Sequence, residues 1–167
     1  MIEPATPENE DERLAALRAL GVLDSAPERI FDDIVAVARA IFGTSMAHIT
    51  LIDKDRQWLK ARVGHDIVET PRDVSFCAHA ILRDDALVVP DAREDPRFHD
   101  NPYVEGEGLR FYVGQPLRVA DGAAIGTLCV ADPGLRDDPT QAQLDALAAL
   151  ARLTVEALLA RKRDAAK

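Results

Sequence analysis

The chain has 167 residues, 47% of them hydrophobic, and its 29 acidic and 20 basic side chains give a net charge of −9. This length suits one domain with a substantial core, and the negative charge opposes binding to nucleic acid or to an anionic membrane. The sequence has no apolar run near the roughly 20 residues of a membrane span, and its polar opening is unlike a signal peptide, so a cytoplasmic protein is expected.

Two helices are predicted before the first strand. In DERLAALRALGVL the leucines recur at helical spacing, and Gly21 is a natural stop. SAPE at 25–28 has the Ser-x-x-Glu form of a capping box, and the apolar positions that follow predict a second helix up to Gly43. Residues 1–8, before the first helix, are expected to be flexible or disordered.

Two β-hairpins are predicted in the middle of the chain. From Met46 the hydrophobic period changes to two, and QWLKARV after the turn DKDR resembles a second strand. FYVGQPLRV and AAIGTLCVA flank Asp121-Gly122, a strong hairpin signal. Between the hairpins we expect a short helix over 74–82, a short edge strand at 86–90, and a long loop with at most one helical turn.

The last predicted element is a long helix from about Thr140 to Arg163, with Asp138 as its cap and Pro139 in its first turn. It carries two apolar stripes, whereas packing on one sheet needs only one. Either the core-facing surface is wide, or the surplus face buries against a second copy of the chain. The contacts predicted for such a homodimer are Leu14, Leu17, Leu144, Leu147, Ala151 and Leu158.

The order of elements predicts an α+β domain with an antiparallel sheet. This order, together with NEDERLAALRALGVLDSAPE, HITLIDKDRQWLKARVG, ETPRDVSFCAHAI, DNPYV and RFYVGQPLRVADGAAIGTLCVAD, resembles a GAF domain of the type found in bacterial sensor histidine kinases and diguanylate cyclases. The resemblance covers about residues 9–163, expected to be one domain, and leaves 164–167 as a flexible end. The chain is either a stand-alone protein or a piece of a longer one.

The resemblance implies a ligand cavity over one face of the sheet, roofed by the short helix and the long loop. The terminal helices would lie on the opposite face and form the dimer. GAF domains host cyclic nucleotides, haem, bilins, metal centres and small metabolites, so the family names no cofactor or ligand for this chain. The implied partners are an unidentified small molecule, a second copy, and a kinase or cyclase output domain.

Cys77 and His79 lie two positions apart in VSFCAHAI, a separation that points them in different directions on a helix. Cys77 is either a small buried hydrophobe or a reactive thiol near a helix start. Bilin attachment is disfavoured, since bilin-binding relatives usually place a histidine directly after the cysteine and Ala78 intervenes here. His79 is either a buried histidine bonded to the loop or a ligand contact, and no metal site is predicted because the histidines lack a ligand spacing.

The remaining candidates follow from strand alternation and side-chain type. His48 and Thr50 share a strand face, and Thr127 and Cys129 share another; if the two strands are neighbours, they form a half-polar patch under the roof. Aromatic residues are candidates for cavity walls, and Lys60 for holding an anion. The complete set predicted to bind a ligand is His48, Thr50, Trp58, Lys60, Ser75, Phe76, Cys77, His79, Tyr103, Phe111, Tyr112, Thr127 and Cys129.

Three functions follow from these features. The first is a sensory module that binds a small molecule and signals through its terminal helices. The second is a thiol-dependent enzyme of the free-methionine-sulfoxide-reductase kind, for which only two cysteines are available. The third is a dimerisation module whose cavity is filled by its own side chains. We expect a binding domain rather than an enzyme.

Overall fold

A six-stranded antiparallel sheet of order β3-β2-β1-β6-β5-β4 forms the centre of the protein. The computed structural model describes all residues, 1–167. The two predicted hairpins are confirmed, because β1 pairs with β2 and β5 pairs with β6. The strands are β1 (Met46–Ile52), β2 (Arg56–Val63), β3 (Glu69–Pro71), β4 (Leu87–Val89), β5 (Phe111–Arg118) and β6 (Ala124–Asp132).

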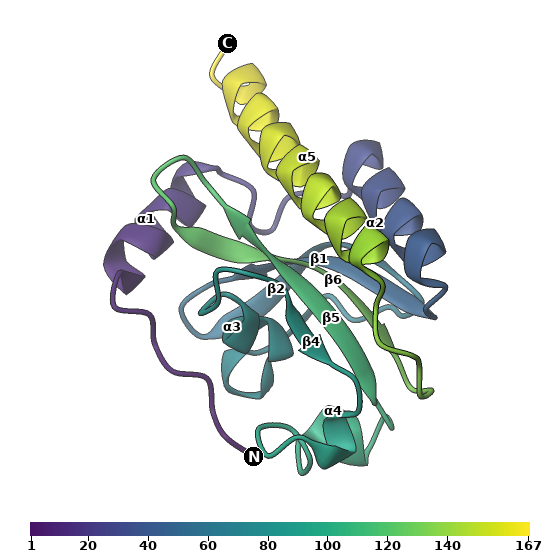
Figure 1. Ribbon diagram of the computed structural model, residues 1–167. Helices are drawn as coiled ribbons and strands as arrows, with labels where there is room; N and C mark the ends of the chain where they lie inside the picture. The colour runs from purple at the N-terminus through teal and green to yellow at the C-terminus, as the bar shows by residue number, and fades with distance from the viewer.

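Helices cover both faces of this sheet (Figure 1). Two of them, α2 (Arg29–Phe42) and α5 (Gln141–Ala165), lie on one face, and α1 (Glu10–Ala19) contributes to the same core. The opposite face carries α3 (Phe76–Ala80) and α4 (Pro102–Glu105) with the 3₁₀ turns η1 (Arg72–Val74) and η2 (Ala92–Glu94). The α+β class and the predicted layers are thereby confirmed. None of the helices is long and apolar enough to cross a membrane.

Strand alternation divides the interior into two cores. Ala47, Ile49 and Leu51 of β1 point toward α2 and α5 and belong to the larger core, of 23 residues. A second core of 15 residues lies under α3 and includes Ile52 and Cys129. We call these two sides of the sheet the helix face and the lid face. β1, β5 and β6 each contribute to both cores because successive side chains point in opposite directions.

A bulge in β2 interrupts this alternation. The register between β1 and β2 shifts between Ile49, opposite Ala61, and Thr50, opposite Leu59, which leaves Lys60 as an extra residue. As a result Trp58 and Ala61, three positions apart, both join the core on the helix face. The insertion also turns the Lys60 side chain to the helix face, where it contacts the start of α2.

Two predicted helix caps are wrong. The N-cap of α2 is Glu28, whose side chain makes no capping bond, and Ser25 instead donates its hydroxyl to the carbonyl of Val22 at 2.5 Å. The N-cap of α5 is Thr140 rather than Asp138, because Thr140 and Gln143 form a reciprocal capping box that Asp138, two residues earlier, is not placed to make.

The residues predicted to form the dimer are instead buried inside the chain. Their exposed fractions do not exceed 8%, apart from half-buried Leu144, which packs against the same core. The prediction of these contacts is wrong because the stripe chosen is the one that α1 and α5 need to cover the sheet. The residues concerned are Leu14, Leu17, Leu144, Leu147, Ala151 and Leu158.

One short strand escaped the sequence analysis, whereas the loop between the hairpins holds the helical turn that was allowed for it. The strand β3 has three residues, and α4 is a single turn capped by the Asn101 side chain, which accepts the backbone N–H of Tyr103. The start of the chain lies against the segments that cover the lid face. The Ile2 N–H donates to the Arg97 carbonyl at 3.1 Å, and the Ile2 carbonyl lies 2.9 Å from His79 Nε2. The boundaries 9–163 of the domain stay a prediction.

Candidate functional site

A cavity of about 310 Å³ lies between the lid face of the sheet and the segment η1–α3. Its floor comes from β1, β2 and β6, and its side walls come from the residues after β2 and from the loop around α4. This volume falls at the lower end of the range of small-molecule sites, roughly 300–1,000 Å³. Apolar walls with a few convergent polar groups are typical of such sites, and this cavity combines both.

Hydrogen bonds hold the segment η1–α3 (Arg72–Ala80), which we call the lid, to the sheet at one side of the cavity. The Ser75 hydroxyl caps α3 by accepting the Ala78 N–H at 3.0 Å, and it donates to Gln57 Oε1 of β2 at 2.5 Å. The other end of the same amide, Gln57 Nε2, donates to the Thr70 hydroxyl of β3 at 3.2 Å. Asn101 Nδ2 donates to the Val74 carbonyl at 2.9 Å. Strand, lid and α4 loop are thereby tied together around the cavity.

Aromatic rings form the inner wall. Phe76 of α3 stacks on Phe98 with ring centroids 3.9 Å apart, and it meets the Tyr112 ring of β5 at 5.2 Å. The Tyr112 hydroxyl reaches the Sγ of Cys77 at 3.0 Å. A Cβ on Gly114 would lie 2.2 Å from that hydroxyl, so the glycine provides the space in which the tyrosine side chain lies. These rings give the cavity a flat, apolar side.

Two histidines lie at the end of the cavity near the β1–β2 edge. His48 Nδ1 and His65 Nε2 are 2.9 Å apart, so one ring donates a proton that the other accepts. Burial, and then the neighbouring His65, lower the pKa of His48 to about 3; burial also lowers the pKa of His65. The pair is therefore neutral at physiological pH and offers hydrogen bonds rather than charge.

The cavity lining contains no lysine or arginine. Its one charged residue is Glu107, an exposed side chain in the loop after α4. Phosphate groups are usually held by arginine or lysine or by the N-terminus of a helix, and the nearest helix here, α3, has only five residues and uses Ser75 to cap its start. The electrostatics of the site thus favour a neutral or cationic guest over an anionic one. No cluster of three or more His, Cys, Asp or Glu side chains that would hold a metal ion is present.

Six of the predicted site residues line the cavity, and seven do not. The six are His48, Ser75, Phe76, Cys77, Tyr103 and Tyr112. Three others lie on the lid face but are completely covered: Thr50 and Thr127, whose hydroxyls are 2.9 Å apart, and Cys129.

The placement of the other four differs from the prediction. Trp58, Lys60 and Phe111 lie on the helix face, away from the cavity. For Phe111 the reason is alternation, since its neighbour Tyr112 takes the lid face; for Lys60 it is the bulge. His79 points outward from α3 to Ile2 and to the edge of the Phe98 ring.

The GAF domain family model matches residues 26–158 of this chain. The chain belongs to the GAF domain family. The predicted resemblance is confirmed, and the sheet with its lid is the GAF arrangement. Cyclic di-GMP phosphodiesterase PA2567 of Pseudomonas aeruginosa is 44% identical over 156 residues, which are 93% of this chain and 27% of that protein. The chain therefore spans about a quarter of the length of this curated relative.

Solved structures agree on the fold. The GAF domain of the Acinetobacter phosphoenolpyruvate-protein phosphotransferase matches with a TM-score of 0.67 and 16% identity, covering 93% of this chain and 98% of that one. A free methionine-R-sulfoxide reductase from Neisseria meningitidis, solved with its substrate, matches with a TM-score of 0.65 and 19% identity, covering 99% and 98%. At these identities the likeness shows the GAF fold alone.

Sequence reasoning missed most of the cavity residues contributed by β2 and the segments around it. Gln57 and Leu59 alternate with Trp58 on the strand, so once Trp58 is placed on the helix face they fall on the lid face. His65 and Thr70 come from the turn after β2 and from β3, which no local pattern predicted. The cavity residues outside the prediction are Ser45, Met46, Gln57, Leu59, Gly64, His65, Ile67, Thr70, Val74, Glu107, Leu109, Ala131 and Pro133.

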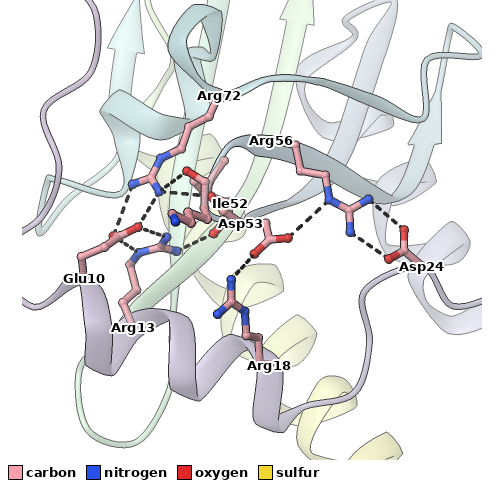
Figure 2. A network of polar contacts seen from close by, with 9 residues as sticks. Glu10, Arg13, Arg18, Asp24, Ile52, Asp53, Arg56 and Arg72 are labelled. Carbon is pink, nitrogen blue, oxygen red and sulfur yellow. Dashed lines mark hydrogen bonds and ion pairs between the residues drawn. The ribbon is translucent and has the colours of Figure 1, made fainter.

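A polar network connects the start of the lid of this GAF domain to α1. Figure 2 shows the Glu10 carboxylate of α1 bound by Arg13 of the same helix and by Arg72 of η1. Arg13 is buried and donates to the Ile52 carbonyl at the end of β1 at 2.6 Å, while Arg72 donates to the Asp53 carbonyl at 3.1 Å. One carboxylate thus joins the helix to both the β1–β2 turn and the lid.

The same network extends to the segment between α1 and α2. Arg56, at the start of β2, binds both carboxylate oxygens of Asp24 at 2.8 Å (Figure 2). It also donates to Glu69 of β3 at 2.8 Å. Asp53 accepts from Arg18 of α1 at 3.3 Å. Bidentate arginine pairs fix orientation as well as distance. The network therefore sets the position of α1 relative to the strands that line the cavity.

A second connection runs through the sheet at the bulge. The ammonium of Lys60 is fully buried and donates to the Ser25 hydroxyl at 2.8 Å and to the Ala26 carbonyl at 2.7 Å. It also pairs with Glu28, whose carboxylate accepts from Arg161 of α5 at 2.8 Å. Because Lys60 follows directly after Leu59 of the cavity floor, it joins the floor to the last turns of α5.

Proposed function

We propose that this chain is a sensory domain that binds a neutral or cationic small molecule and passes the signal to its terminal helices. The observation that supports this most directly is the cavity under α3, with apolar and aromatic walls, convergent hydrogen-bonding groups and no lysine or arginine. A purely dimerising domain with a filled interior would not need such a space. The class of guest is inferred from the side chains that line the cavity, because the family hosts many kinds of ligand.

The expected guest has hydrogen-bonding groups and an apolar or ring-shaped portion. Gln57, Ser75, Thr70 and the histidine pair offer donors and acceptors, and Phe76 offers a flat surface. A cyclic dinucleotide, with two phosphates, is a poor match to a lining whose only charge is negative. Cyclic di-GMP is therefore proposed as the molecule on which an output domain acts, and not as the ligand of this domain.

We infer that occupancy of the cavity is transmitted along the two connections described above. A guest that shifts η1–α3 changes the position of Arg72 on Glu10, and one that shifts β2 changes the position of Lys60 on Glu28. The supporting relative is a phosphodiesterase in which this region makes up 27% of the length, so a kinase, cyclase or phosphodiesterase output is the partner proposed for α5. A ligand can bias the helices only if it binds their two arrangements with different affinity.

A homodimer is proposed through the outer surface of α2 and α5. The two helices lie side by side (Figure 1), and the large apolar side chains that they expose are Ile30, Val37 and Leu153, at 52%, 46% and 58% exposure. Leu150 and Ala157 of α5 are half-buried beside Leu153. We name these five residues the outer helical surface. A second copy would cover it and place two α5 helices next to each other.

The ligand proposal is tested by native mass spectrometry of the purified chain and by thermal-shift screening of neutral, cationic and anionic metabolites. We expect a neutral or cationic compound to raise the melting temperature by several degrees. Leu109→Trp, which places a bulky ring in the cavity wall, should abolish the shift. Leu135→Trp changes a residue that is 61% exposed outside the cavity and should preserve it. A response only to anions, or an equal response in both variants, would refute the proposal.

The thiol-dependent enzyme stays a second candidate because Cys77 and Cys129 lie together, with their sulfurs 3.7 Å apart. Reduction of a sulfoxide would consume both thiols and require a reductant to restore them. Incubation of the chain with free methionine sulfoxide and a dithiol tests this directly. Turnover that Cys77→Ser and Cys129→Ser both abolish would favour the enzyme, and no turnover would leave the binding domain.

A further inference from the structure

The two cysteines of the chain meet at the contact between the lid and the sheet. Cys77 is in α3 and Cys129 is in β6, and the Sγ atoms are 3.7 Å apart. Both residues are buried, with exposed fractions of 3% and 0%. They differ in access, because Cys77 is part of the cavity wall and Cys129 is not. A small molecule in the cavity therefore reaches the first thiol and not the second.

The surroundings of the pair favour a thiolate on Cys77. Its sulfur accepts a hydrogen bond from the Tyr112 hydroxyl at 3.0 Å, in the space that Gly114 leaves free. Burial by itself raises the pKa of Cys77, but hydrogen bonds from Cys129, Thr127, Thr50 and Tyr112 lower it to about 7. Burial and the Cys77 sulfur raise the pKa of Cys129. Cys77 is thus the thiolate that can attack, and Cys129 remains a protonated thiol.

We infer that Cys77 and Cys129 form a modification site for small hydroperoxides, at which oxidation joins the lid helix α3 to the sheet strand β6 through a disulfide. In the first step the Cys77 thiolate attacks one peroxide oxygen. An S–O bond forms, the O–O bond breaks, and hydroxide or an alkoxide leaves. The sulfur becomes a sulfenic acid and the peroxide is reduced by two electrons.

In the second step the Cys129 sulfur attacks the sulfenic sulfur. The S–S bond forms and the S–O bond breaks, and the oxygen leaves as water with the proton of Cys129. In sum, two thiols and one hydroperoxide give one disulfide, one water and one further water or alcohol. Because Cys129 touches Cys77 and no other cysteine exists in the chain, the product is defined. An external dithiol reverses the reaction by exchange.

The oxidised form differs from the reduced one at the cavity. A disulfide has an S–S length of about 2.05 Å, so the two sulfurs must approach each other by about 1.7 Å. The disulfide removes the Cys77 thiolate that accepts the Tyr112 hydroxyl, and it fixes α3 on β6. Oxidation therefore changes the same wall that a guest would contact, and this site adds a chemical input that is independent of the ligand proposed above.

The test treats the purified full chain with hydrogen peroxide and follows it by intact mass and by peptide mapping. The wild type should lose two hydrogens as a monomer and yield a peptide that links Cys77 to Cys129, reversibly with dithiothreitol. Cys129→Ser should instead accumulate a sulfenic acid on Cys77 that dimedone traps. In Cys77→Ser, Cys129 should stay reduced over the same time. The folded state of each variant is checked by circular dichroism, with alanine variants at both positions if serine impairs folding.

Tyr112→Phe provides the matched control, because it keeps the ring and removes the hydroxyl from Cys77. Its disulfide should form about three- to tenfold more slowly at neutral pH, since less of Cys77 is then thiolate. The inference fails if the wild type forms no intramolecular disulfide, if Cys129 reacts first, or if the pair is oxidised only under conditions that unfold the protein. Unchanged kinetics in Tyr112→Phe would remove the role assigned to the tyrosine.

Discussion

At the scale of single residues, the site depends on which face of a strand each side chain takes. Tyr112 and Phe111 are adjacent and equally aromatic, yet only Tyr112 lines the cavity, and Phe111 lies in the core on the helix face. Gly114 decides how far Tyr112 reaches, because a side chain there would collide with its hydroxyl. Residue type predicts which contacts a side chain can make, whereas strand register decides on which face of the sheet it makes them.

The histidine pair leads to a pH prediction. The pKa of His48 is lowered to about 3 in the folded chain, against roughly 6.5 unfolded. Protons then bind preferentially to the unfolded state between these values, so His48 makes the protein less stable as pH falls from 6.5 toward 3. By NMR, the ring signals of His48 should not move between pH 8 and pH 5, while those of imidazole added to the same sample do. Titration of His48 near pH 6.5 would contradict the lowered pKa.

The sequence allowed the candidate site to be predicted only in part, and the reason is visible in particular residues. His48, Ser75 and Cys77 were found because alternation and the helical period of VSFCAHAI are local patterns, and Tyr112 was found because it is aromatic. Lys60 was misplaced because a bulge depends on the pairing of two strands, which no single strand reveals. Glu107, from the loop after α4, reaches the cavity only through the fold of the whole chain.

At the scale of elements, the order of helices and strands was predictable and their ends were less so. The sheet, both hairpins and the layers agree with the patterns of hydrophobicity. The N-cap of α5 is Thr140 and not the predicted Asp138. Both residue types can cap a helix, and only the geometry of the chain chooses between them. The three-residue β3 is too short for a period to appear.

The contact of α1 with the lid predicts an acid response. Burial by itself raises the pKa of Glu10, but the hydrogen bonds from Arg13 and Arg72 lower it to about 2, from 4.5. The ion pairs therefore stabilise the fold fully above about pH 4.5, and this contribution is lost as pH falls toward 2. Its upper limit is about 3 kcal/mol. Glu10→Gln should lower the free energy of unfolding in urea at pH 7 and flatten its decline below pH 4.5.

An exposed carboxylate on the same helix supplies the control for that experiment. Glu12→Gln changes an exposed residue of α1 and should preserve both the stability at pH 7 and its dependence on pH below 4.5. If Glu10→Gln and Glu12→Gln behave alike, the network of Figure 2 contributes nothing measurable to the position of α1.

At the scale of the whole molecule, the two layers of helices have different positions relative to the cavity. The lid layer encloses the cavity, and the layer of α2 and α5 presents the outer helical surface, with the C-terminal turns of α5 extending beyond the sheet (Figure 1). Two stripes on α5 were visible in the sequence, but not which of them the sheet would cover. Leu147 and Leu158 were assigned to a partner because a sequence pattern cannot tell an internal partner from an external one.

The homodimer proposal predicts a change in mass. The double variant Val37→Glu, Leu153→Glu places two charges on the outer helical surface and should convert a dimer to a monomer in light scattering at micromolar concentration. Leu82→Glu changes a residue on the lid side that is 42% exposed and should leave the mass as it is. A wild type that is monomeric at these concentrations, or a double variant that stays dimeric, would contradict the proposed interface.

The bulge makes the proposed connection through Lys60 separable from the cavity. Leu59 and Ala61 already pair with adjacent residues of β1, Thr50 and Ile49, so a chain that lacks Lys60 can form an uninterrupted ladder with every other side chain on its present face. Such a chain would retain the binding chamber and forfeit the ammonium that reaches Glu28 and, through it, Arg161. Deleting Lys60 would therefore remove one of the two proposed connections and leave the cavity and the contact of Arg72 with Glu10 in place.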